Sequence, residues 1–124
     1  MKIKVLLGLF LIAVPLGAAS AMPVSTFLEK AGRLEKKGPL ALLSGDLKLL
    51  MNQVKADFAS LRTERQAGKA GGKPLAYCPA EKKVEITDKD VMAAMRAVPA
   101  AQRPGTETRG ALRAMLVRKF PCPG

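Results

Sequence analysis

The hydrophobic and polar positions along the chain repeat mainly with the period of an α-helix. The clearest stripe consists of apolar residues spaced three or four apart: Leu47, Leu50, Val54, Phe58 and Leu61. This spacing places them on one face of a helix and leaves charged residues on the opposite face. Ser44, just before this segment, is a residue type that begins helices. The pattern therefore predicts a long helix over residues 46–67.

A shorter helix is expected before this one. Thr26 and Glu29 have the spacing of a capping box, and the apolar residues that follow recur at helical intervals. Two lysines and then Gly38 end the segment, which places positive charge at the negative end of the helix dipole and a glycine past it. These signals predict a helix over residues 26–37.

The second half of the chain predicts two further helices. Thr87 and Asp90 form another capping box, ahead of an apolar stripe that predicts a helix over residues 88–97. A loop rich in proline separates it from a fourth helix, expected over residues 106–119 with Thr106 as its cap.

These elements predict an all-α fold, a small bundle of four to five helices, because no alternating stretch is long enough to build a sheet. Residues 22–124 are expected to form a single helical domain. The N-terminal helices occupy residues 22–67, and a second helical half occupies residues 75–124. Residues 68–74, rich in glycine and lysine, are interpreted as a flexible linker between the halves.

Residues 1–21 have the organisation of a secretory signal peptide. Lys2 and Lys4 precede an apolar run over residues 5–16, and small residues follow up to Ala21, after which cleavage is expected. A membrane anchor is the alternative, but the run covers about twelve residues and a spanning helix needs about 20. The chain is therefore expected to be exported by the general secretory route. No later segment is long enough to be a transmembrane helix.

The chain has two cysteines, Cys78 and Cys122, and no histidine. In an exported protein a cysteine pair usually forms a disulfide, because oxidising compartments keep thiols paired. A loop of this length would stabilise the domain by about 4 kcal/mol in the chain-entropy model. A metal site and an intermolecular bridge are the alternatives. Two thiolates without further ligands make a poor zinc site, so a disulfide that closes the bundle is favoured.

Charge and composition narrow the function to binding. After removal of the signal peptide, 19 basic and ten acidic residues give a net charge of +9. Such a surface attracts anions, although it is also compatible with simple solubility. Nucleic acid is not expected as a partner, because few aromatic side chains are present to stack on bases. Without histidine or a free thiol, no catalytic constellation is evident. We therefore expect neither an enzyme nor a cofactor or metal.

The second half of the chain also resembles a known family. Its features are the Tyr77–Pro79 entry, a helix led by Thr87, a loop with proline and arginine over residues 99–103, and a final helix ending in Phe120–Cys122. In this order and spacing, residues 75–122 resemble the Rap/Tai family of immunity proteins. That family protects bacteria against peptidoglycan amidases delivered by type VI secretion.

The resemblance implies a periplasmic domain with a disulfide that binds a peptidoglycan amidase, blocks its catalytic cleft partly with a protruding loop, and can form a homodimer. The matching loop covers residues 99–107, and Arg103 is its most obvious charged contact. The partner-binding residues implied in this way are Pro99, Gln102, Arg103, Pro104 and Glu107. A different class of function stays open alongside this one, a cationic helical envelope protein that binds anionic surfaces and has no toxin partner.

Overall fold

The computed structural model describes residues 21–79 and 85–123, and this part of the chain is built from helices. The elements, in order, are α1 (Val24–Lys37), η1 (Gly38–Leu43), α2 (Gly45–Ala70), α3 (Asp88–Ala97), η2 (Ala100–Gly105) and α4 (Thr108–Lys119), where η marks a 3₁₀ helix. The predicted all-α class is confirmed. The predicted signal peptide, apart from Ala21, lies outside the described residues. No described helix combines the length and the apolar character needed to cross a membrane.

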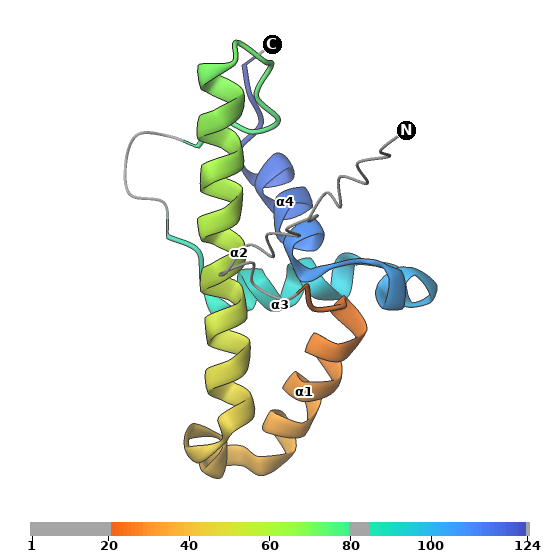
Figure 1. Cartoon of the computed structure of the whole chain (residues 1–124). Coiled ribbons are helices and arrows are strands. Elements are labelled where there is room, and N and C mark those ends of the chain that lie inside the picture. The colour runs from red at the N-terminus through yellow and green to blue at the C-terminus, as the bar shows by residue number, and fades with distance from the viewer. Residues whose placement is uncertain (1–20, 80–84, 124) are drawn as a thin grey trace, which may run out of the picture.

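The two halves of the chain pack into one body (Figure 1). The long helix α2 contacts α1 at one end and α4 further along its length, and α3 packs against both α1 and α4. Each α-helix contributes one of the large side chains that are fully buried: Val24, Leu61, Met95 and Leu112. The apolar stripes of the sequence therefore meet in a single shared core.

Two of the predicted helix starts are confirmed in detail. The Thr87 hydroxyl accepts a hydrogen bond from the Asp90 backbone N–H at 3.2 Å, and the Asp90 carboxylate accepts one from the Thr87 N–H at 2.9 Å. This reciprocal pair is the capping box of α3, whose bounds agree with the prediction. At the start of α2, the Ser44 side chain accepts from the Asp46 N–H at 3.3 Å.

The predicted caps of α1 and α4 are wrong. Helix α1 begins at Val24, so Thr26 lies inside it, and α4 begins at Thr108 rather than at Thr106. The cause is a short antiparallel pairing of the backbone that no local pattern encodes. The Val24 N–H donates to the Thr106 carbonyl at 2.8 Å, and the Thr108 N–H donates to the Met22 carbonyl at 2.9 Å. Both helices begin where this pairing ends.

Helix α2 is longer than predicted. It continues to Ala70, so the first three residues of the expected 68–74 linker are helical. Gly68 does not break it, because a single glycine inside a helix costs only about 1 kcal/mol relative to alanine. The chain turns instead at Gly71 and Gly72, where Gly72 has a φ of 67° that favours glycine.

A buried polar contact joins α2 to the start of α4. Thr108 is fully buried, and its hydroxyl donates to the Asp57 carboxylate at 2.6 Å. The second carboxylate oxygen of Asp57 accepts from the Gln53 side-chain amide at 3.0 Å. The Asp57 carboxylate thus places negative charge close to the N-terminus of α4, whose own first turn carries no acid.

We predict that Thr108→Val destabilises the fold by about 2 kcal/mol, because the substitution keeps the shape but removes a hydrogen-bond donor from a buried carboxylate. Urea denaturation of the oxidised chain, residues 22–124, measures this free energy. Thr63→Val, at an exposed position on α2, is the matched control and should cost less than about 0.5 kcal/mol. Equal effects of the two substitutions would contradict a specific role for the buried pair.

The carboxylate of Asp90 stabilises the fold in a pH-dependent way. Its pKa is lowered from the ordinary value of 3.8, first by the hydrogen bond from the Thr87 backbone and then by the Lys119 ammonium group. Lys119 lies 3.0 Å away and links the end of α4 to the start of α3. Because the pKa is lower in the folded state, this stabilisation is present above the unfolded-chain pKa and is lost as pH falls through the folded one.

We therefore predict that Asp90→Ala lowers the Tm at pH 7, and that the difference from wild type closes as pH falls below 3.8. Thermal denaturation followed by circular dichroism across this range tests the prediction. Asp88→Ala, which removes another acid from the same helical turn, is the control for a general charge effect. A Tm difference for Asp90→Ala that persists unchanged in acid would show that capping by the carboxylate is not the cause.

Candidate functional site

The residues that the sequence marked for partner binding all lie on one projecting segment. Residues 99–107 connect α3 to α4 and contain η2, which extends away from the body of the molecule (blue, on the right of Figure 1). Four of the five residues, Pro99, Gln102, Pro104 and Glu107, are exposed. The segment therefore presents polar and proline side chains to solvent.

Arg103 has a different position from the one expected of a charged contact. Its side chain turns back toward α3 and is only half exposed. The guanidinium group donates from Nε to the Val98 carbonyl at 2.9 Å and from a terminal nitrogen to the Arg96 carbonyl at 3.1 Å. These carbonyls belong to the last turn and the C-cap of α3, where the helix dipole favours positive charge. Arg103 thus anchors the segment.

Hydrogen bonds within the segment also fold it without a partner. The Gln102 N–H donates to the Pro99 carbonyl at 2.8 Å, and the Thr106 N–H donates to the Arg103 carbonyl at 3.4 Å. The Thr106 hydroxyl, which the sequence suggested as a helix cap, donates instead to the Gln102 carbonyl at 2.8 Å. The projecting segment is consequently a set of turns held at both ends rather than an open loop.

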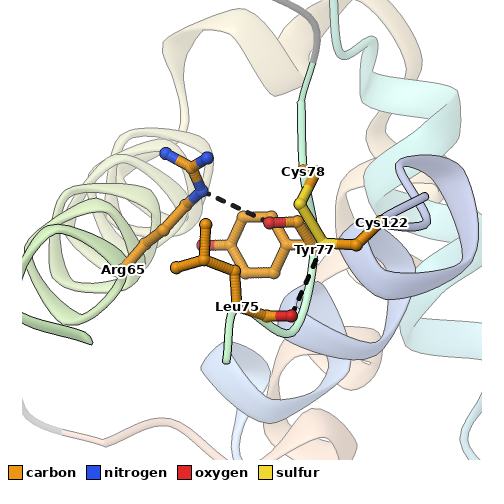
Figure 2. The surroundings of a disulfide bond; sticks show 5 residues. All are labelled: Arg65, Leu75, Tyr77, Cys78 and Cys122. Atoms are coloured by element: carbon orange, nitrogen blue, oxygen red, sulfur yellow. Dashed lines mark hydrogen bonds between the residues drawn. A yellow bond between two sulfur atoms is a disulfide. The ribbon is translucent and has the colours of Figure 1, made fainter. Parts of the chain in front are cut away.

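The expected disulfide between Cys78 and Cys122 is confirmed (Figure 2). Cys78 and Cys122 are bonded with a Cα–Cα distance of 4.8 Å, and the described residues contain no free cysteine. Next to the bond, the Cys78 N–H donates to the Phe120 carbonyl at 2.8 Å. The Cys122 sulfur lies 3.5 Å from the Leu75 carbonyl oxygen, a contact without a proton because the sulfur is oxidised.

Tyr77 attaches this bridge to α2. Its ring is buried, and its hydroxyl donates to the Leu61 carbonyl at 3.2 Å. Arg65 donates from Nε to the Tyr77 carbonyl at 3.3 Å, as Figure 2 shows. Burial raises the pKa of Tyr77 above 10.0, Glu64 adds to the rise, and the cations Arg65 and Arg113 oppose it. This hydroxyl therefore stays protonated and structural near neutral pH.

The sequence did not reveal a groove along α2. It has a volume of about 1000 Å³ and an apolar lining that includes Val54, Phe58 and Phe120. Lys55 and Arg62 border it, and Asp88 is the one carboxylate among its described lining residues. Among the described residues, no cluster of three or more histidine, cysteine or acidic side chains could hold a metal ion.

The chain was also compared with protein families, with curated proteins and with solved structures, and none of these comparisons returns a match. Residues 99–107 are therefore considered as a binding site on the basis of their geometry and of the sequence resemblance.

We predict that Arg103→Ala loosens the projecting segment without unfolding the protein. Loss of the two hydrogen bonds to the end of α3 frees η2, so the Gln102 and Thr106 amides should exchange with deuterium about tenfold faster. Hydrogen exchange resolved by NMR measures this change. Arg118→Ala removes the same charge from an exposed position on α4 and should leave both amides unchanged. If both variants left exchange unchanged, Arg103 would not be the anchor.

Proposed function

We propose that this protein is a periplasmic binding protein of the immunity type, and that it inhibits a peptidoglycan amidase by occluding the active site with the projecting segment, residues 99–107. The observation that carries the proposal is that this segment extends from the body and is already folded. Gln102, Pro104 and Glu107 are exposed on it, while Arg103 holds its base.

The folded state of the segment favours inhibition by occlusion. A segment that is ordered before binding loses little conformational entropy when it enters a cleft, so more of the contact energy appears as affinity. Pro99 and Pro104 restrict the backbone further. A rigid projection of this kind fits a concave site better than it fits a flat surface.

The exposed side chains also suit an amidase cleft. An amidase recognises a carboxamide, and the Gln102 side chain presents this group with both its donor and its acceptor. Glu107 adds an acceptor beside Arg109, whose guanidinium lies 3.6 Å from it. We therefore assign Gln102 as the central contact and Glu107 as a peripheral one. Arg103 becomes a positioning residue rather than the direct contact that the sequence suggested.

The covalent chemistry of the chain supports a location outside the cytoplasm. Disulfides persist in oxidising compartments such as the bacterial periplasm, and Cys78 and Cys122 are bonded. The organisation of residues 1–21 predicts export to the same compartment. Peptidoglycan, the substrate of the proposed target, lies in the same compartment.

The proposal is tested by inhibition of purified amidases. Oxidised protein, residues 22–124, is titrated into a panel of small peptidoglycan amidases that use a cysteine nucleophile, with release of peptide from cell-wall sacculi as the readout. We expect one class of amidase to be inhibited stoichiometrically, and we expect the protein to protect cells that express this amidase in the periplasm from lysis. Failure to inhibit any amidase, together with capture of an unrelated protein from periplasmic extract, would overturn the proposal.

We predict that Gln102→Ala weakens inhibition at least about tenfold, the usual effect of truncating a central contact. Asn52→Ala removes a carboxamide of the same kind from an exposed position on α2 and should have no effect. Circular dichroism spectra of both variants should match wild type, because neither side chain is buried. Equal inhibition by the two variants would exclude Gln102 from the contact.

A further inference from the structure

Three leucines at the turn between α1 and α2 expose most of their surface. Leu40, Leu42 and Leu43 expose 68%, 79% and 86% of their surface, and we refer to them as the leucine corner. They lie on η1, at the end of the molecule where the chain reverses from α1 into α2 (Figure 1). Leu49 and Met51, on the following helix α2, expose 45% and 50% of their surface.

The exposure follows from the local backbone. Gly38 ends α1 with a φ of 56°, and Pro39 then starts the 3₁₀ helix η1. Within this tight turn only Ala41 packs against the core, so the leucines on either side of it point outward. A contiguous apolar patch in water is unfavourable and usually marks a surface that binds something.

Exposed lysines flank the leucine corner in the sequence. Lys36 and Lys37 precede it, Lys48 follows it, and all three are exposed. None of them takes part in an ion pair with another described residue, although the Lys37 ammonium donates to the Ser44 hydroxyl at 3.4 Å.

The acids near the leucine corner already have cationic partners. The Asp46 carboxylate lies 3.3 Å from the Lys30 ammonium and 3.8 Å from the Arg33 guanidinium. Glu35 pairs with Arg96 of α3 at 3.2 Å. These acids therefore do not neutralise the lysines that border the leucines, and the corner combines apolar side chains with uncompensated positive charge.

We propose that the leucine corner docks on an anionic lipid bilayer. The leucines would enter the boundary between headgroups and acyl chains, and Lys36, Lys37 and Lys48 would contact lipid phosphates. Apolar burial and attraction of basic side chains to anionic lipid together drive this kind of peripheral binding. This surface lies apart from the projecting segment, so the inference is independent of the proposed inhibition of an amidase.

A second copy of the chain fits the leucine corner less well. The leucine corner consists of three side chains, whereas one partner of a standard protein interface contributes about 20–30 residues and buries about 800 Å². Two copies that met face to face would also bring their lysines together, which is repulsive. An anionic bilayer can take up a small apolar surface, and its phosphates attract the neighbouring lysines.

Vesicle binding tests the proposal with the oxidised chain, residues 22–124. The buried side chains of the described part all lie at or after Met22, so this chain keeps the whole core and the disulfide. It also omits the apolar run of residues 5–16, which would bind lipid by itself. We expect it to co-sediment with vesicles of phosphatidylglycerol and phosphatidylethanolamine and not with vesicles of phosphatidylcholine.

Substitutions identify the surface. Combined Leu40→Ser, Leu42→Ser and Leu43→Ser should weaken binding at least about tenfold, and combined Lys36→Gln and Lys37→Gln should do so by roughly the same factor. Val117→Ser, at a partly exposed position on α4, is the matched control and should bind as wild type does. The substituted residues are exposed, so an unchanged thermal melt is expected for every variant.

A fluorescent reporter gives an independent readout, because the chain contains no tryptophan. Emission from Leu42→Trp should shift to the blue on anionic vesicles, whereas emission from Val117→Trp should not shift. Absence of vesicle binding, or full binding by the triple serine variant, would overturn the proposal. So would a concentration-dependent dimer in sedimentation velocity that the serine substitutions abolish while no vesicle binding is seen, because a second copy would then occupy the corner.

Discussion

The hydrogen bond from the Thr108 hydroxyl to the Asp57 carboxylate determines how the two halves of this protein fit together. It joins the middle of α2 to the first residue of α4 at a position with almost no solvent access. A buried carboxylate is costly unless its oxygens are hydrogen-bonded, so it restricts the distance and orientation of the two helices. The N-terminal segment also holds the start of α4, because the Met22 carbonyl accepts a hydrogen bond from the Thr108 N–H. The start of α4 is therefore held from two directions.

The shape of the projecting segment, residues 99–107, depends on the fixed start of α4 and on Arg103. At one end, Arg103 holds the segment on the last carbonyls of α3, and at the other end the Val24 N–H holds the Thr106 carbonyl. A segment anchored at both ends, by the Arg103 side chain and by the Thr106 carbonyl, can keep its exposed side chains in place without burying them.

Local patterns in the sequence predicted those parts of the fold that depend on nearby residues. The helix after Thr87 is one example, because its capping box acts within four residues, and the cysteine pair is another, because only one intramolecular pairing exists. Thr26 precedes Glu29 with the same spacing, and Thr106 is also a residue type that begins helices, yet both helices begin elsewhere, next to a backbone pairing between distant segments. Such long-range contacts cannot be recognised from the spacing of residues within one segment.

Asp57 and Arg103 differ in how far the sequence indicates their positions. Asp57 lies three residues after Val54 and four before Leu61, on the apolar face of α2, and an acid on such a face requires a buried partner. The pattern thus indicated that Asp57 has a buried hydrogen-bond partner, but it did not identify Thr108 as that partner. The position of Arg103 had no such signal, because its guanidinium caps carbonyls that only the end of α3 brings near.

The two surfaces proposed for binding differ in chemistry and lie at opposite ends of α1. This helix contacts η1 at one end and η2 at the other, and its 14 residues span about 21 Å. Side chains that dock on lipid must be apolar and exposed, as the leucines of η1 are, whereas η2 is polar and fixed by its anchors. With the leucine corner on a bilayer, α1 would hold the projecting segment away from the lipid and toward the compartment where cell-wall enzymes act. The rigid helix between them makes the two proposed interactions compatible, because neither surface needs the other to move.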